Sequence, residues 1–206
     1  MDDFTAKLED FDVPQLRGKW VRFTWNLVTA KLPSTPPHGF QIARATPALA
    51  AEVLQLVTDA YASDPVWKSM LPAIKERMRV RIAETIADDN CEYLMLSQAD
   101  KMVAVSGIAL EHWTGQNLLT GICVLPAFQR QRLGTFLLGY SLRRLRARGR
   151  SVATVYTEHG SLADRKVYPL FGGRREIDVE YPGASARPQA IDHRPKLLDR
   201  RGGLRE

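Results

Sequence analysis

The chain has 206 residues, of which 45% are hydrophobic and 25% are charged, and its formal net charge is +6. This length allows one domain with appendages, and the composition is typical of an ordinary soluble globular protein. A membrane protein is not expected, because no apolar run approaches the ~20 residues that a membrane span requires.

The N-terminus, MDDFTAKLEDFD, is acidic and polar, so it is unlike a secretory signal. Cys91 and Cys123 lie inside two predicted strands, where buried free thiols are expected. Two cysteines provide no disulfide framework, which favours a reducing, cytoplasmic location.

Positive charge gathers at the end of one predicted helix, between Arg143 and Arg150, and again in the tail after Pro182. Cations at a helix C-terminus complement the helix dipole and usually form a solvated face. No aromatic interleaving and no nucleic-acid motif accompany these charges, so nucleic acid is not the expected partner.

Residues 1–38 are predicted to be an N-terminal extension and linker, in which Lys19–Val28 has the composition of a strand and Pro33–His38 is a break. One folded domain is expected over residues 39–182, followed by a basic, irregular tail over residues 183–206. The extension could cover a cleft, add an edge strand or mediate a homodimer.

Hydrophobic periodicity and turn residues place the elements of the folded domain. Strands are predicted over Phe40–Ala45, Cys91–Ser97, Met102–Trp113, Leu118–Leu125, Val152–Thr157 and Arg175–Tyr181. Helices are predicted from the Thr46–Pro47 cap, around Ile74–Ile86, over Leu133–Ala147 and over Ser161–Phe171, with a loop at Ser63–Pro72. Strand, helix and strand over residues 118–157 predict a right-handed βαβ crossover with parallel strands, in an α/β (α+β) fold.

The segment Ile122–Leu138 joins a buried strand to a helix through a turn rich in glutamine and arginine. Such a helix N-terminus is an anion site, because unpaired N–H groups and the helix dipole both favour negative charge. Arg130 and Arg132 lie where the dipole disfavours cations, which an anion such as phosphate would explain. Gly134 removes the Cβ that would hold the anion away from the backbone. A tight connection with solvated arginines is the alternative.

With the order of elements around it, this turn resembles the cofactor motif of the GNAT N-acetyltransferase superfamily. That motif is Q/R-x-x-G-x-G/A after a strand that ends in Val-x-Pro. Here the strand ends Val124-Leu125-Pro126 and the motif is Gln129-Arg130-Gln131-Arg132-Leu133-Gly134. Arg132 stands where the first glycine normally is, and its backbone can still donate if its φ is negative. The resemblance covers about Phe40–Tyr181 and implies a mixed sheet of about six to seven strands, flanked by about four helices and splayed into a V between the fourth and fifth strands.

A second segment is similar to the family pattern N-x-x-A-x-x-L-Y-x-x-x-G-F. Tyr168 and Gly172 match directly, while Ser161 stands for the Asn and Gly173 for the Phe. The matching tyrosine often protonates the departing thiolate of coenzyme A, so the resemblance implies that Tyr168 is the general acid. A tyrosine packed between helix and sheet is the alternative.

The resemblance implies an acetyl-CoA-dependent N-acetyltransferase, which transfers an acetyl group directly from coenzyme A to an amine of a small molecule or peptide. Acetyl-CoA is the implied cosubstrate, and no metal is implied. The implied cofactor-binding residues lie on the strand, in the turn and near the second segment: Ile122, Cys123, Val124, Gln129, Arg130, Gln131, Arg132, Leu133, Gly134, Thr135 and Ser161. A non-catalytic acyl-CoA-binding or sensing domain is the alternative function.

A general base is harder to assign, because the strand Leu118–Leu125 lacks the glutamate that some family members carry there. Glu111, at the end of the third strand of the domain, is our candidate base. His112, Glu158 and His159 also follow strand ends and are alternatives.

The acceptor site is expected to involve the loop Tyr61–Leu71, in which Asp64 and Trp67 are the notable side chains. Cys123 could in principle act as a nucleophile and form an acyl-enzyme, but a buried cysteine within a strand is the simpler interpretation.

Overall fold

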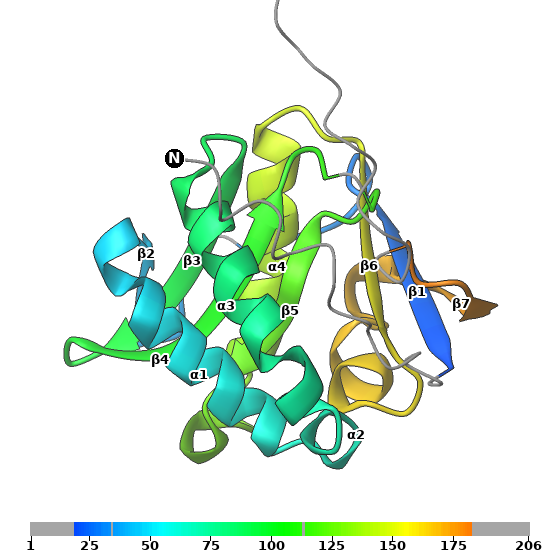
Figure 1. Ribbon diagram of the computed structural model, residues 1–206. Helices are drawn as coiled ribbons and strands as arrows, with labels where there is room; N and C mark the ends of the chain where they lie inside the picture. Colours follow the sequence, from blue (N-terminus) through cyan, green and yellow to red (C-terminus); the bar gives the residue numbers. More distant parts are fainter. Residues whose placement is uncertain (1–18, 34, 113, 183–206) are drawn as a thin grey trace, which may run out of the picture.

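The computed structural model describes residues 19–33, 35–112 and 114–182. The strands of these segments are β1 (Trp20–Asn26), β2 (Gln41–Arg44), β3 (Cys91–Gln98), β4 (Lys101–Ala109), β5 (Leu118–Val124), β6 (Val152–Glu158) and β7 (Arg174–Val179) (Figure 1). The helices are α1 (Ala50–Ala62), α2 (Pro65–Lys68), α3 (Leu71–Ala87) and α4 (Leu133–Ala147). The predicted fold class, α+β, is confirmed. The strands form two sheets with helices packed on them, and the two sheets separate between β5 and β6.

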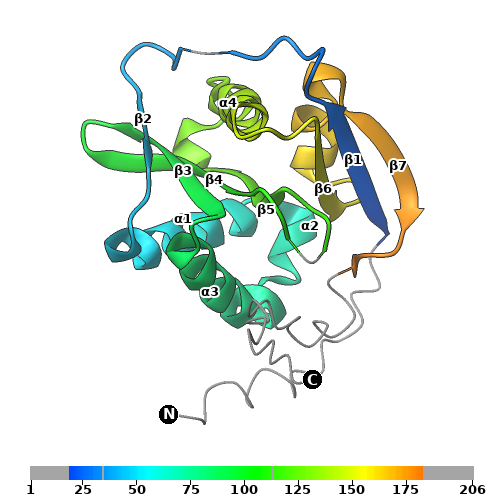
Figure 2. The same ribbon diagram turned by 90° about the horizontal axis from the view of Figure 1, so that it is seen from above.

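The larger sheet is the antiparallel meander β2-β3-β4-β5. α1 and α3 cover one face and α4 covers the other (Figure 2). Alternate residues of each strand serve the two faces: Leu94 and Leu96 belong to the core on the α4 side, and Tyr93 belongs to the core under α1 and α3. The predicted elements of this layer are therefore confirmed, with α4 at the predicted bounds.

The smaller sheet corrects the predicted organisation at the N-terminus. β1 lies between β6 and β7 and pairs antiparallel with both. Its inward side chains, Val21, Phe23 and Trp25, are each 0% exposed and pack in the core beneath α4. Residues 20–26 are thus a central strand of the domain and not an extension of it, because alternate large apolar residues bury one whole face. Residues 1–18 and the tail 183–206 lie outside the described residues.

The two sheets meet at one end and separate at the other. The Asn117 N–H donates to the Thr154 carbonyl at 2.7 Å, and the Thr154 N–H donates to Asn117 Oδ1 at 3.1 Å. Beyond this junction β5 pairs only with β4, and β6 pairs only with β1. The result is a fork between β5 and β6, with α4 as the connection that joins the two strands (Figure 1).

Buried charge attaches α4 to the larger sheet. The Glu92 side chain, 3% exposed, accepts hydrogen bonds from Arg144 at 2.9 Å and from Arg148 at 2.8 Å. Both arginines lie toward the C-terminus of α4, where they also complement the helix dipole.

Two predicted segments differ from the structure. The loop Ser63–Pro72 contains the short helix α2, which Asp64 caps by accepting a hydrogen bond from the Val66 N–H at 3.0 Å. The helix predicted over Ser161–Phe171 is present only in part, as the short π-helix η4 (Ala163–Val167) followed by the 3₁₀ helix η5 (Leu170–Gly172). Pro169, which has no N–H to donate, lies between the two, so one continuous α-helix does not form.

None of the described helices combines the length and the apolar character that crossing a membrane would require.

Candidate active site

A cavity of about 620 Å³ occupies the fork between the two sheets. Its size is within the range of small-molecule sites. The walls come from the ends of α1 and α3, from β5, from the loop before α4 and from η4. Ten of the expected site residues line it. They are nine residues expected to bind the cofactor and the expected general acid, Tyr168: Ile122, Cys123, Val124, Gln129, Arg130, Arg132, Leu133, Gly134, Thr135 and Tyr168.

Three expected site residues do not line this cavity. Gln131 is exposed on the outside of the loop, and its amide donates to the Ala127 carbonyl at 3.5 Å. Ser161 is 0% exposed, where its hydroxyl bonds Thr157 Oγ1 and accepts from the Asp164 N–H. Ser161 thus organises the start of η4 rather than reaching the cavity.

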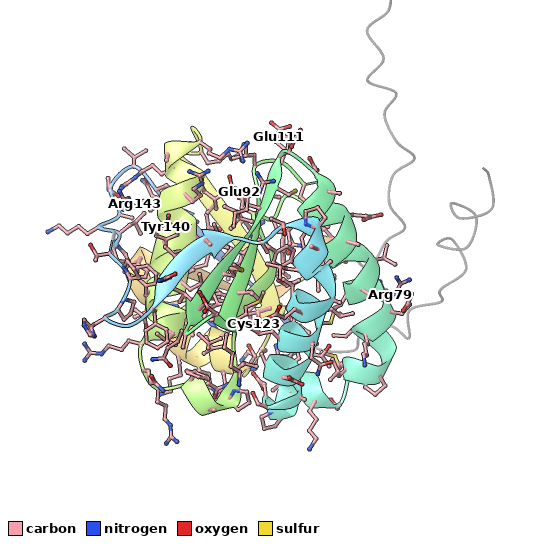
Figure 3. The ribbon with its side chains drawn as sticks, turned by 90° about the vertical axis from the view of Figure 1, so that its left-hand side faces the viewer. Arg79, Glu92, Glu111, Cys123, Tyr140 and Arg143 are labelled. Atoms are coloured by element: carbon pink, nitrogen blue, oxygen red, sulfur yellow. The ribbon has the colours of Figure 1, made fainter. Side chains whose placement is uncertain are left out.

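Glu111 is the third. It is exposed just beyond β4 and lies far from Cys123, at the other end of the sheet (Figure 3). The expectation that Glu111 is the base therefore finds no support, because its exposed side chain is not part of the cavity wall.

The loop before α4 has an unusual backbone. Arg130 and Arg132 have φ values of 61° and 62°, in the left-handed region that glycine tolerates best. The condition of a negative φ at Arg132 is thus not met: the residue is in the left-handed region, which glycine adopts at the least cost. Two strained arginines, separated by one residue in a loop that lines a cavity, are typical of a functional site.

The N-terminus of α4 has the features of an anion site. No side chain caps it, and no acidic residue lies in its first turn. The first N–H groups of a helix have no partner within the helix, so those of Leu133, Gly134 and Thr135 remain available at the cavity wall. The side chains of Arg130 and Arg132 and the exposed Lys166 of η4 add positive charge around it.

Gly134 is not required by the packing of the protein itself. A Cβ at this position would meet only the Cγ2 atoms of Ile122 and Val124, each at an ordinary contact distance of 3.6 Å. The open side of Gly134 faces the cavity. Gln129 holds the loop in place, because its amide donates to Ser63 Oγ at 3.1 Å and to the Val124 carbonyl at 3.3 Å.

β5 bulges at Gly121, beside the Tyr168 hydroxyl. The register between β4 and β5 shifts between Ser106 and Ile108, and Gly121 has a φ of 68°. A Cβ at Gly121 would overlap the Tyr168 hydroxyl oxygen. A glycine at position 121 therefore permits two things: the left-handed backbone of the bulge, and the close approach of the Tyr168 hydroxyl to the strand backbone.

Tyr168 is held rigidly and is 2% exposed. Its ring meets Trp25 edge to face, with centroids 5.8 Å apart, and lies 5.6 Å from the Phe23 ring. Burial raises the pKa of Tyr168 well above its ordinary value, and the negative charge that a Cys123 thiolate would carry raises it further. The hydrogen bond from the backbone N–H of Ile122 lowers the pKa, but offsets only part of the increase. Tyr168 is therefore a phenol, and hence a proton donor, at neutral pH.

The helix η4, which ends just before Tyr168, is itself anchored by an ion pair between a buried carboxylate and an exposed arginine. Arg175 donates to both carboxylate oxygens of Asp164, at 2.7 Å and 2.9 Å, and the Gly160 N–H donates to the same carboxylate at 2.8 Å. Asp164 is 3% exposed.

Cys123 is 2% exposed and its Sγ lies 3.5 Å from the Thr120 carbonyl. Burial raises the pKa of Cys123 to about 12, so its sulfur is a thiol at neutral pH and a poor nucleophile. The interpretation as a buried structural cysteine agrees with this position.

Carboxylates are scarce at the cavity. Asp64 is the acidic residue among its described walls, and both of its oxygens are engaged, by the Val66 N–H at 3.0 Å and the Leu162 N–H at 2.8 Å. Glu158 is 4% exposed at the end of β6, and burial raises its pKa, but it is not part of the wall. No cluster of His, Cys, Asp and Glu that could hold a metal ion occurs in the segments that the structure describes.

The cavity wall also includes residues that the sequence did not indicate, from β1, from α3, from the segment before β5 and from the segment after β7: Trp20, Arg77, Arg81, Gln116 and Tyr181. Trp67, which was expected at the acceptor site, does line the cavity. Its ring stacks on Tyr61 with centroids 4.9 Å apart and meets Trp20 edge to face with centroids 6.0 Å apart.

The model of the acetyltransferase (GNAT) family matches residues 54–172, which is more than half of the chain. The chain therefore belongs to the acetyltransferase (GNAT) family. No curated protein matches it.

Solved structures share the fold at low identity. A Drosophila protein is 17% identical with a TM-score of 0.59, over 78% of this chain and 49% of its own. A conserved protein of unknown function from Staphylococcus epidermidis is 18% identical with a TM-score of 0.55, over 78% of this chain and 58% of its own. A PaiA N-acetyltransferase from Thermoplasma acidophilum, in complex with coenzyme A, is 12% identical with a TM-score of 0.42, over 53% of this chain and 74% of its own. The chain thus spans about half the length of the first two proteins.

Proposed function

We propose that this protein is an acetyl-CoA-dependent N-acetyltransferase, which transfers the acetyl group directly to an amine. The observation that carries the proposal is the pairing, in one cavity, of an uncapped helix N-terminus with a buried tyrosine hydroxyl at a strand bulge. Membership of the acetyltransferase (GNAT) family supports the same chemistry.

The residues present fit acetyl-CoA. The open side of Gly134, which the packing of the protein does not require, provides close approach to backbone N–H groups for a pyrophosphate. Backbone N–H groups of Leu133, Gly134 and Thr135 and the Thr135 hydroxyl would hold these phosphates. The edge of β5 that faces the fork has no partner strand in the described residues, so the backbone of Ile122–Val124 could pair with the amides of the pantetheine arm.

When bound, acetyl-CoA supplies an acyl group that is activated as a thioester. The proposed transfer forms a bond between the amine nitrogen and the acetyl carbon and breaks the bond between that carbon and sulfur. The sulfur leaves with the bonding electron pair, and the Tyr168 hydroxyl holds the proton that it takes up. The raised pKa of Tyr168 ensures that this proton is present at neutral pH.

The amine must also lose a proton. The cavity-wall carboxylate Asp64 already accepts two backbone hydrogen bonds. We therefore assign no side chain as base and propose that water carries this proton away. The value of kcat/KM is then expected to rise with pH toward the pKa of the amine used, and Glu158→Gln is expected to leave that profile unchanged. A profile that loses its dependence in Glu158→Gln would make Glu158 the base.

Cofactor binding is tested first, by thermal denaturation of the full chain with and without acetyl-CoA. We expect acetyl-CoA to raise Tm and Gly134→Glu to abolish the increase, because the new carboxylate enters the anion site while its Cβ meets no close contact. Ala147→Glu, exposed at the other end of α4, is the matched control and should keep the increase. No shift of the wild-type Tm at millimolar acetyl-CoA would refute the proposal.

Transfer is tested by following release of the coenzyme A thiol over a panel of amines. Tyr168→Phe should lower kcat while the Tm increase with acetyl-CoA is kept, since the hydroxyl acts on the leaving group. The alternative function, an acyl-CoA-binding domain without catalysis, predicts a normal Tm increase and no thiol release with any amine.

A further inference from the structure

Arg81 presents a guanidinium to the cavity without a carboxylate to balance it. It lies on α3, is partly buried and lines the cavity. Its Nη1 donates to the Tyr181 hydroxyl at 3.3 Å, and no ion pair joins Arg81 to any acidic residue in the described part of the chain. A guanidinium withdrawn from water normally has an anionic partner, because desolvation of the charge is otherwise uncompensated.

Arg77 brings a second positive charge to the same place. It precedes Arg81 by one helical turn, so both side chains lie on one face of α3, and both line the cavity. Burial lowers the pKa of Arg77, and the charge of Arg81 lowers it further, which reflects how near the two guanidinium groups are. Two like charges at a cavity wall repel a cation and attract an anion.

Gln116 adds a neutral donor from another element. It precedes β5, is 2% exposed and lines the cavity. Its Nε2 has no hydrogen-bond partner among the described residues. A buried amide donor without a partner costs stability, so a donor of this kind at a cavity wall points to an acceptor atom of a ligand.

These donors lie away from the loop that is proposed to hold pyrophosphate. Gln116 precedes β5 and the loop Gln129–Arg132 follows it, so the seven residues of β5 separate the two. Around the Arg81 end, the cavity wall is aromatic: Trp20 stacks on Tyr181 with centroids 4.3 Å apart. A planar or apolar group therefore fits beside the charges.

We infer that the acceptor is a small amine that carries a carboxylate and an apolar side chain, and that Arg81, Arg77 and Gln116 bind the carboxylate at this end of the cavity. The inference rests on the proposed function, because it names the acceptor of that transfer. A polyamine or another purely cationic amine is disfavoured by the same charges.

The carboxylate site is tested first by binding alone, without transfer. The probes are 3-phenylpropionate and 3-phenylpropionamide, which differ only in the charge of the headgroup, and the readout is the fluorescence of Trp20 and Trp67, which line the cavity. We expect the acid to bind roughly tenfold or more tightly than the amide, as for hydrogen bonds to a charged group. Equal affinities of the full chain for the two probes would overturn the inference.

Arg81→Gln should remove the preference for the acid. Arg79→Gln is the matched control, because Arg79 lies on the same helix, is exposed (Figure 3) and pairs with Glu76. Gln116→Met, which removes the amide donor but keeps an unbranched side chain of similar length, should weaken binding of the acid and leave that of the amide unchanged. A preference that persists in both Arg81→Gln and Gln116→Met, with Tm values near that of the wild type, would refute the assignment.

Transfer then separates this inference from the proposed function. We expect phenylalanine to be acetylated with a KM at least tenfold below that of phenylalaninamide, and Arg81→Gln to raise the KM for phenylalanine while the Tm increase with acetyl-CoA is kept. Equal KM values for the two amines would overturn the carboxylate site and leave the transferase standing. Absence of any acetyl-CoA binding would refute the proposed transferase activity. The probe measurements would then still test the carboxylate site at Arg81, Arg77 and Gln116.

Discussion

The left-handed backbone of Arg132 gives a quantitative prediction for a pair of variants, Arg132→Gly and Arg132→Ala. A residue with a Cβ in this conformation is destabilised by about 1–2 kcal/mol relative to glycine. Glycine gains conformational freedom in the unfolded chain, which offsets about 0.4–1 kcal/mol. Arg132→Gly should therefore be more stable than Arg132→Ala by ~1 kcal/mol, with the arginine charge absent from both.

This difference is large enough to measure as a shift of Tm. For a chain of 206 residues, the entropy of unfolding is about 0.4 kcal/mol/K, so ~1 kcal/mol corresponds to roughly 2–3 °C. Calorimetry of both variants under reversible conditions is the assay. Because the two share the loss of one cation, any difference between them in affinity for acetyl-CoA reports on the backbone of the loop.

Arg143 provides a control in which the order reverses. It is exposed within α4 (Figure 3), where glycine is less favourable than alanine by about 1 kcal/mol. Arg143→Gly should accordingly melt below Arg143→Ala. If Arg132→Ala were as stable as Arg132→Gly while the Arg143 pair behaved as expected, the reasoning from a positive φ at Arg132 would be refuted.

Three further predictions concern the bulge, a buried carboxylate and the thiols. Gly121→Ala should destabilise the protein strongly, but less in a Tyr168→Phe background, because the overlap is with the hydroxyl and the ring carbon Cζ is 3.7 Å away; a coupling of ~1 kcal/mol or more in urea unfolding is expected, and additive losses would contradict it. Burial acts to raise the pKa of Glu92, but hydrogen bonds and charges from its two arginine partners bring the net pKa below the ordinary value. The carboxylate therefore stabilises the fold above pH ~4.3 and loses this contribution as pH falls through its lower folded pKa. Glu92→Gln should then lose more stability at pH 7 than at pH 3, and parallel pH curves for the two proteins would speak against this. Burial raises the pKa of Cys91 and of Cys123 to about 12, so neither should react with a disulfide reagent at pH 8 until the protein is unfolded; rapid labelling of the native protein would disprove their inertness.

Local patterns in the sequence were sufficient for the elements that bury one clear face. The stripe of leucines over Leu133–Ala147 predicted α4 at its observed bounds, and turn residues separated the strands of the meander. Where local signals compete, prediction failed. One helix was predicted over Ser161–Phe171, but Pro169 and the left-handed Phe171 limit that segment to a short π-helix and a short 3₁₀ helix.

The place of β1 could not be predicted, since it depends on pairing across more than 100 residues. The composition of Lys19–Val28 indicated a strand, and the strand is present. Its partners are β6 and β7, and nothing within the segment itself encodes which strands it joins. The register is set by burial of Val21, Phe23 and Trp25, a condition that only the assembled core imposes.

The two ends of the cavity also differ in how close together their residues lie in the sequence, and this difference bears on function. The end proposed for the cofactor is nearly contiguous in sequence, from Gly121 to Thr135, so the resemblance of one motif could indicate its residues. The end proposed for the acceptor joins Trp20, Arg77, Gln116 and Tyr181, which no motif connects. One signal was nevertheless available: Arg77 and Arg81 stand three and seven residues after Ile74, on the apolar stripe of α3. Two arginines at positions of a helix that should be buried indicate a polar cavity beneath that helix. This signal is local to α3, so it could have been found without knowledge of which other segments complete the cavity.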